Sequence, residues 1–147
     1  MFGAHELAGF GGRAGAWLLD ILFSVLPILV AFGLIAGGTE AAGGLLLLAG
    51  LAWAYVVYFP LTMARGGERN GQTWGKQLTG IRVVRDGGEP VDFGFGLLRE
   101  LVIRQLLFGV VGGFFLLPPL LDYLWPLWDD ENRTLHDMVA NTHVVKA

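Results

Sequence analysis

The stretch RAGAWLLDILFSVLPILVAFGLIA, from Arg13 to Ala36, decides the fold class of this chain. After Arg13 its only charged residue is Asp20, and about 20 apolar residues are enough for a helix to cross a bilayer. A carboxylate at the centre of a membrane helix costs roughly 2.5–3.5 kcal/mol, so we expect Asp20 to be paired, protonated or used. About two helical turns separate Arg13 from Asp20, which places both side chains on one stripe. The sequence predicts a membrane helix over 14–36 with a polar site built on these two residues.

The composition also indicates a membrane protein. Hydrophobic residues make up 54% of the 147 residues and charged residues 16%, against about 25% charged in soluble domains. The net charge is −3, and no basic stripe suggests nucleic acid as a partner. Without cysteine there is no disulfide or thiol nucleophile, and the three histidines lack the usual zinc spacing. We therefore expect a single domain over 1–147, with no enzymatic activity, metal or cofactor.

Further apolar segments predict additional membrane helices. Residues 43–64 contain no charge and form the clearest predicted span. Residues 105–128 carry only Asp122, but prolines and glycines interrupt them, so two arrangements stay open. They form either one kinked span or, with the preceding residues, two helices over about 95–111 and 114–128. The second of these would reach only about 22 Å, short of a ~30 Å bilayer core. The predicted fold is an all-α membrane protein with three to four transmembrane or re-entrant helices and a small cytoplasmic cap containing short β-strands.

Positive charge is concentrated after the second predicted span. Because Lys and Arg near span ends mark the cytoplasmic side, we expect the N-terminus and the loop over 65–94 to face the cytoplasm. Within this loop, residues 81–85 read as a strand, and Asp86-Gly87-Gly88 reads as a turn that leads back through 89–91. This pattern predicts a small β-hairpin. Seven of the ten basic residues carry the charge bias: Arg65, Arg69, Lys76, Arg82, Arg85, Arg99 and Arg104.

The loop sequence recurs near the C-terminus. Residues 71–84 read GQTWGKQLTGIRVV and residues 132–145 read NRTLHDMVANTHVV, with a threonine and two valines at matching positions. We interpret the two segments as an internal repeat, each copy following a helical pair. Both copies then lie on one side of the membrane, which favours two helices before the second copy and a cytoplasmic motif over 132–147. The strands 81–84 and 142–145 are expected to pair with each other.

These motifs resemble those of the RDD family of bacterial membrane proteins, over nearly the whole chain. The family is named for an arginine and two aspartates, and the similar residues here are Arg13, Asp20 and Asp137. The loop is similar to the family pattern G-x-T-x-G-K-x-x-x-G-x-x-V-V, with matches at Gly71, Thr73, Gly75, Lys76, Gly80, Val83 and Val84. The closing motif is similar to R-T-x-H-D-x-x-A-x-T-x-V-V, with matches at Arg133, Thr134, His136, Asp137, Ala140, Thr142, Val144 and Val145.

The resemblance implies a multi-pass protein of the bacterial inner membrane, and the family is described as involved in transport, with some members linked to cation/proton exchange. Two functions stay open for this chain, and we favour the first because of the intramembrane carboxylate and the family description. In the first, Asp20 exchanges a proton for Na⁺, Li⁺ or K⁺, and Arg13 tunes its affinity. In the second, Asp20 and Arg13 form a static pair in a non-catalytic accessory subunit whose cap docks a partner. Three or four helices enclose little polar volume, so we expect a homo-oligomer or a partner membrane subunit.

The remaining candidate residues lie toward the C-terminus. Asp122 either ligates a cation beside a proline-broken helix or is solvated at the membrane interface, and we favour the solvated position. His136 and Asp137 are a candidate proton-handling pair, since imidazole titrates near neutral pH. Adjacent residues do not face each other on a helix, however. We therefore expect Asp137 to clamp the loop, against Lys76 or Arg133.

Overall fold

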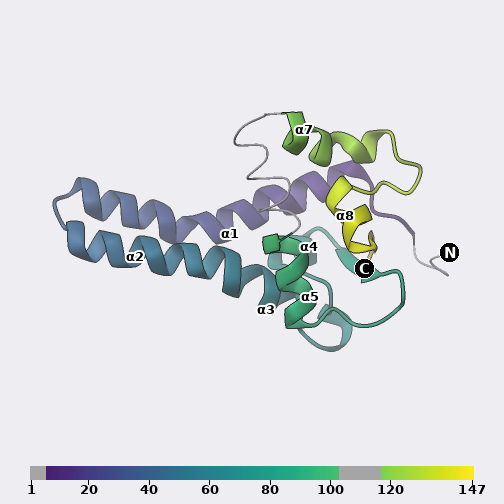
Figure 1. Ribbon diagram of the computed structural model, residues 1–147, viewed down its shortest axis with the longest axis horizontal. Coiled ribbons are helices and arrows are strands. Elements are labelled where there is room, and N and C mark those ends of the chain that lie inside the picture. The colour runs from purple at the N-terminus through teal and green to yellow at the C-terminus, as the bar shows by residue number, and fades with distance from the viewer. Residues whose placement is uncertain (1–5, 103–116) are drawn as a thin grey trace.

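The computed structural model describes residues 6–102 and 117–147, and these form a long helical hairpin with a group of shorter elements at one end (Figure 1). We call residues 10–63 the helical hairpin and the described residues 64–102 and 117–147 the cap. The hairpin consists of α1 (Phe10–Ala36), α2 (Glu40–Ala52), the π-helical η1 (Trp53–Tyr58) and α3 (Phe59–Met63). The molecule is mostly helical, as the sequence predicts.

The two arms of the hairpin agree with the predicted helices and extend them. α1 begins at Phe10 instead of residue 14, so Arg13 lies inside the helix. The second arm begins at Glu40 and continues without a break in helicity to Met63. The arms approach closely at Gly43, where a Cβ atom would lie 2.4 Å from Ile35 Cγ1. A small residue is therefore needed at this crossing.

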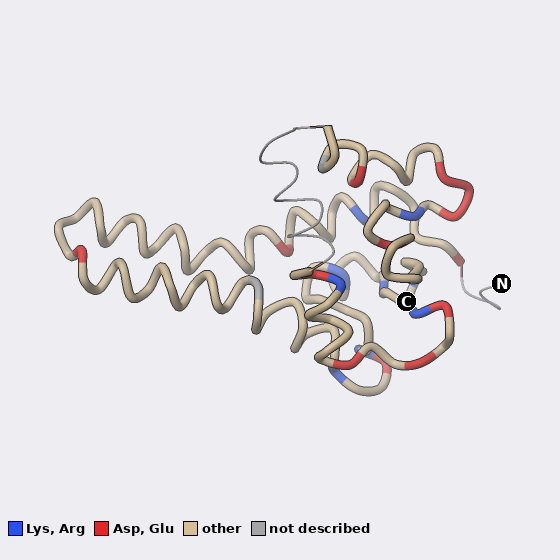
Figure 2. Tube along the Cα trace, viewed as in Figure 1, with Lys and Arg blue, Asp and Glu red and all other residues tan. Residues whose placement is uncertain are grey.

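Both arms are long and apolar enough to cross a membrane. An 18-residue window within Phe10–Ala36 has a mean hydropathy of 2.5, and only 17% of that window is buried within the protein. The corresponding values for a window within Glu40–Met63 are 1.9 and 29%. A core helix of a soluble protein would be mostly buried, whereas here large apolar side chains point outward along the hairpin. Charged residues gather in and around the cap (Figure 2). This distribution, with large exposed apolar surface on the hairpin, indicates association with a membrane.

The cap contains short helices and one two-stranded sheet. In chain order its elements are η2 (Gly67–Arg69), α4 (Trp74–Leu78), β1 (Ile81–Arg85), α5 (Phe93–Leu97), α7 (Leu117–Leu124), η4 (Trp125–Leu127), α8 (Leu135–Ala140) and β2 (Thr142–Lys146). β1 and β2 pair antiparallel, which confirms the expected pairing of 81–84 with 142–145. The predicted β-hairpin is wrong, because no strand forms over 89–91. The C-terminal strand takes the place beside β1, and after its turn the chain runs into α5.

The two repeat segments have the same local structure. Thr73 and Thr134 are the N-cap residues of α4 and α8, and each side chain accepts a hydrogen bond from the backbone N–H three residues later. A strand follows each helix, and the equivalent residues Val83 and Val144 lie opposite each other in the sheet. Left-handed backbone conformations recur at two further pairs of equivalent positions, Gly71 with Asn132 and Gly80 with Asn141.

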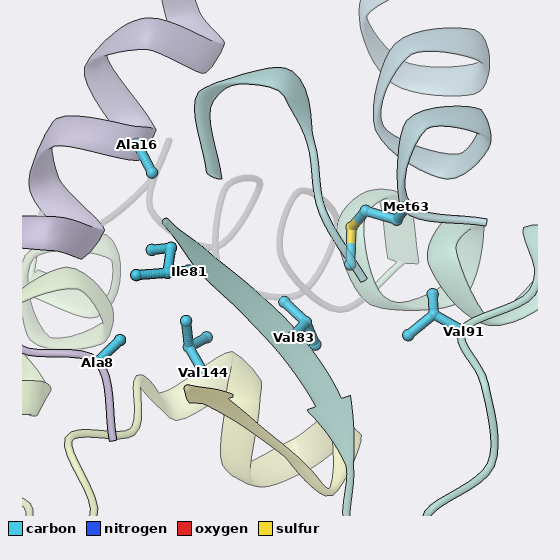
Figure 3. Packing of buried hydrophobic residues seen from close by; sticks show 7 residues of the cluster. All are labelled: Ala8, Ala16, Met63, Ile81, Val83, Val91 and Val144. Carbon is cyan, nitrogen blue, oxygen red and sulfur yellow. The ribbon is translucent and has the colours of Figure 1, made fainter. Parts of the chain in front are cut away.

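The apolar core of the cap lies where the sheet meets the ends of the hairpin (Figure 3). Val83 and Val144 are each 1% exposed, and Ala16 of α1 and Met63 of α3 pack into the same cluster. The cap is thus packed onto both arms instead of hanging from a linker. The cluster comprises Ala8, Ala16, Met63, Ile81, Val83, Val91 and Val144, with Phe95 packed against it.

The predicted helices over 95–111 and 114–128 fall partly on residues outside the described part of the chain, as does the choice between one kinked span and two helices over 105–128. Within the described residues, α7 spans eight positions, about 12 Å, which is too short to cross a bilayer. It lies beside the N-terminal half of α1 (Figure 1). Leu117, Leu120 and Leu124 are exposed along it.

Candidate functional site

Asp20 lies inside a cage of hydrogen-bond donors between α1 and the start of α4. Its Oδ1 accepts hydrogen bonds from the Tyr58 hydroxyl at 2.7 Å and from the Gly75 backbone N–H at 2.9 Å. Its Oδ2 accepts one from Thr73 Oγ1 at 2.7 Å and lies 3.6 Å from Lys76 Nζ. The side chain is 2% exposed. These donors supply the partners that a buried carboxylate requires.

The motif around α4 builds this cage through local backbone geometry. Thr73 has an extended backbone and caps α4, accepting a hydrogen bond from the Lys76 N–H at 3.2 Å while donating to Asp20. Gly75 lets the helix approach α1 so closely that its N–H reaches the carboxylate. A Cβ at Gly75 would lie 2.4 Å from the Ala16 carbonyl oxygen and 2.5 Å from Asp20 Oδ1.

Gly75→Ala is therefore expected to lower the free energy of unfolding by about 1–3 kcal/mol, since the added methyl group must push α4 away from α1. Gly44→Ala on α2 is the matched control, because a Cβ atom added there would meet nothing within 4 Å. It should leave stability unchanged or slightly raised. The measurement is the unfolding transition in mixed detergent with a rising fraction of SDS. Equal stability of the two variants would contradict the close approach.

A second buried cluster surrounds Asp137. Its Oδ2 lies 2.7 Å from Arg13 Nη1, and its Oδ1 accepts a hydrogen bond from Arg99, which also bonds Glu100. Asp137 closes a capping box with Thr134 at the start of α8 and is fully buried. Burial raises the pKa of this carboxyl, but the guanidiniums of Arg99 and Arg13 outweigh burial and hold the pKa well below its usual value of 3.8.

The predicted pairing of Arg13 with Asp20 is wrong. Arg13 bonds Asp137, and the basic neighbour of Asp20 is Lys76. Two helical turns place Arg13 and Asp20 on one stripe, but they also separate the two residues by about 10 Å along the helix axis. Each side chain therefore contacts the part of the cap that packs beside its own turn of α1.

Asp122 is buried, so the prediction that it is solvated is also wrong. Its Oδ1 accepts a hydrogen bond from the His136 backbone N–H at 2.8 Å, and its Oδ2 lies 2.7 Å from His136 Nδ1. Asp122 thus acts on the N-terminus of α8 as Asp20 does on α4, because Gly75 and His136 are equivalent positions of the repeat.

The expected partners of Asp137 also need correction. Lys76 and Arg133 do not bond it: Lys76 lies by Asp20, and Arg133 pairs with Asp129 and Glu131. His136 Nε2 is 3.9 Å from Asp137 Oδ1, beyond hydrogen-bond range, in line with the argument that adjacent helical residues do not face each other. Thr142 Oγ1 lies 3.3 Å from the Asp137 carboxylate. Asp137 therefore does not clamp the loop over 65–94; it bonds Arg13 of the hairpin and Arg99.

The polar clusters border a common cavity of about 310 Å³ between α1, α4, α7 and α8. Arg13, Asp20, Lys76, Arg99, Glu100 and His136 contribute its polar lining, and Phe10, Trp17, Leu120, Tyr123 and Leu124 much of its apolar lining. Arg13 and Asp20 thus belong to one site although they do not bond each other. Among residues 6–102 and 117–147, no group of three or more His, Asp or Glu side chains is placed to hold a metal ion.

The sequence gives little indication that Tyr58 and Glu100 belong to the site. Tyr58 stands in an apolar span, where a tyrosine is indistinguishable from an interfacial anchor. Glu100 adjoins Arg99, and charged neighbours near a span end are usually solvated. The sequence also allows Arg99, in place of Arg13, as the partner of Asp20, but Arg99 bonds Asp137 and Glu100. The packing of α5 against α3 brings Arg99 and Glu100 to the cavity.

Known proteins are similar in sequence to this chain over most of its length. The RDD family model matches residues 7–141 of the chain. The uncharacterized protein YckC of Bacillus subtilis (strain 168) is 30% identical over 143 residues, which cover 97% of this chain and 87% of YckC. No solved structure matches the chain.

Proposed function

The chain belongs to the RDD family of membrane proteins, and on that premise we propose that it is a non-catalytic accessory module of a bacterial inner membrane. The helical hairpin anchors the chain, and the cap docks a partner membrane subunit. The observation that carries this proposal is the use of Asp20. Both oxygens of its carboxylate already accept hydrogen bonds, from Tyr58 on one arm of the hairpin and from Thr73 and Gly75 in the cap. The buried charge thus ties cap to hairpin.

The distribution of charge supports an orientation for the module. The basic residues gather in the cap and near the start of α1, at one end of the molecule (Figure 2). Segments rich in Lys and Arg stay on the cytoplasmic side of bacterial membranes. We therefore propose a multi-pass protein with the cap and the N-terminal end of α1 in the cytoplasm, and with the α1–α2 turn on the other side.

The hairpin offers little support for a route through a single copy. Residues 25–38 and 41–52 carry no polar side chain. Ser24 donates a hydrogen bond to the Asp20 backbone carbonyl at 2.7 Å, so even this hydroxyl is engaged. An ion that passed Asp20 toward the far side would find no side-chain ligand in these two segments, and an unpaired charge in the bilayer core is costly. An accessory role requires no such route.

A proton-coupled cation carrier is the second candidate, because one observation favours it. Lys76 Nζ lies 3.6 Å from Asp20 Oδ2, and both residues line the cavity. A Na⁺, Li⁺ or K⁺ ion at the carboxylate would compete with the ammonium of Lys76 for Asp20. Lys76 would then be the coupling group, because it lies beside Asp20, whereas Arg13 bonds Asp137. Such a carrier would need a homo-oligomer to complete its route.

Exchange measured in proteoliposomes separates the two candidates. Full-length protein is reconstituted in vesicles with an imposed pH gradient, Na⁺, Li⁺ or K⁺ is added, and the gradient is followed with a pH-sensitive dye. We expect no cation-dependent collapse beyond that of protein-free vesicles. A collapse that persists in the exposed-residue control Asp130→Asn, but is lost in folded Asp20→Asn and Lys76→Gln, would overturn the accessory proposal in favour of the carrier.

The composition of the complex gives the accessory proposal its own positive test. The protein is extracted from its host membrane in a mild detergent, and the complex is weighed by native mass spectrometry. A different membrane protein present in stoichiometric amount is the expected result. A complex made of this chain alone would count against the accessory role.

A further inference from the structure

We propose that the 310 Å³ cavity is a binding site for an anionic amphiphile, with a phosphate or carboxylate headgroup at Arg13 and an apolar chain leaving past α1 and α7. This inference goes beyond the accessory role, since it assigns a ligand to the cavity whether or not a partner subunit is present. Three features of the cavity support such a ligand: unmatched donors, the charge of the lining, and an apolar rim.

Arg13 brings unmatched hydrogen-bond donors to the cavity. Its Nη1 bonds Asp137, whereas its Nε and Nη2 are buried without a partner in the described structure. A buried donor that stays unpaired costs about 1–3 kcal/mol, and more when it is charged. A guanidinium presents its N–H groups as a planar fork that fits the oxygens of phosphate and carboxylate groups. An anionic oxygen near Arg13 would satisfy both free donors.

The charges on the cavity lining are compatible with an anion. Arg13, Lys76 and Arg99 contribute three cations, against the two carboxylates Asp20 and Glu100. Both carboxylates already have partners, Asp20 in its donor cage and Glu100 on Arg99. Asp137, behind the lining, neutralises part of the positive charge through Arg13 and Arg99. The unpaired donors of Arg13 therefore favour an anionic headgroup more strongly than the net charge of the cavity lining does.

The rim of the cavity is apolar and exposed. Phe10, Trp17, Leu120 and Leu124 all line the cavity, and their exposed fractions are 37%, 38%, 55% and 38%. They lie on α7 and on α1, the first arm of the helical hairpin, and these two helices run side by side (Figure 1). An acyl chain would cover this rim, whereas a free anion would leave it exposed. The size also fits, because a cavity of this volume holds about ten waters or one headgroup.

The test uses full-length protein in a non-ionic detergent and two lipids with the same chains, dioleoylphosphatidylglycerol and dioleoylglycerol, which lacks the phosphate. Native mass spectrometry counts retained lipid, and thermal unfolding reports stabilisation by each lipid or by inorganic phosphate. We expect retention of one phosphatidylglycerol per chain, with at least about tenfold preference over dioleoylglycerol, as one hydrogen bond to a charged group implies. Stabilisation by inorganic phosphate as well as the lipid would identify the headgroup as the main determinant, and stabilisation by the lipid alone would identify a site for the intact amphiphile.

Two variants locate the binding. Arg13→Lys keeps a cation for Asp137 but removes the planar fork, so we expect about tenfold weaker retention. Ala14→Leu leaves every charge in place and fills part of the cavity lining, so it should abolish retention even if Arg13→Lys folds poorly. Ala41→Leu is its matched control at an exposed position of α2. Equal retention of both lipids, no retention of either, or unchanged retention in Ala14→Leu would each overturn the proposal.

Discussion

Asp137→Ala is expected to lower the free energy of unfolding by about 3–5 kcal/mol, the cost of leaving one buried charge without its partner. The expectation is at the upper end because the carboxylate serves two guanidiniums, those of Arg13 and Arg99, and is itself fully buried. Removal would also open the capping box with Thr134 at the start of α8, worth about 1 kcal/mol. Unfolding in a rising fraction of SDS, followed by tryptophan fluorescence, measures the change.

Asp130→Ala is the matched control for this experiment. Asp130 is exposed and lies in the same C-terminal part of the cap, so its removal should change stability by less than about 0.5 kcal/mol. A loss at Asp137 no larger than the loss at Asp130 would show that the buried cluster does not form.

The pH dependence follows from the same carboxyl. Its pKa is lower in the folded protein than the usual 3.8, so the folded state favours the ionised form. The stability gained from this preference is present above the unfolded pKa and is lost as the pH falls through the lower folded pKa. Wild type should therefore lose this stability only below about pH 4, and Asp137→Asn should lack that part of the acid dependence.

Asp20→Ala is expected to cost about 3–5 kcal/mol for the same physical reason in a different cluster. Lys76 would lose its buried counter-charge, and the donors of Tyr58, Thr73 and Gly75 would lose their acceptor. Because these donors join the cap to the hairpin, we also expect faster proteolysis within residues 64–80. The measurements are the SDS unfolding transition and limited proteolysis of protein in detergent, again with Asp130→Ala as control.

A second substitution sharpens this result. Lys76→Met in the Asp20→Ala background removes the ammonium that faced Asp20 and should recover part of the loss, whereas Arg13→Met in that background should add its own cost independently. If Arg13→Met recovered stability and Lys76→Met did not, the partner of Asp20 would be Arg13 and not Lys76, contrary to the structure.

Local pattern is enough to predict much of this fold. The apolar runs around residues 14–36 and 43–64 predict the two arms because a helix of that length and composition is stable in lipid without further partners. The repeated Thr-led segments predict paired strands, since a capped helix followed by a strand is specified within a dozen residues. The N-terminus of α4 forms by the same local rules, with Thr73 as its N-cap.

The partners of the buried charges are not predictable in this way. From the sequence, Arg13 and Asp20 look like a pair because they share a helical stripe, and Asp122 looks solvated because acidic residues follow it. The tertiary structure assigns Arg13 to Asp137, Asp20 to the start of α4, and Asp122 to His136. Which residues sit in the membrane depends on the summed transfer free energy of a segment, and the sequence alone determines that sum. Which charges meet depends on how distant segments pack along the hairpin, because a hydrogen-bonded ion pair forms only where the charged atoms come within about 4 Å of each other.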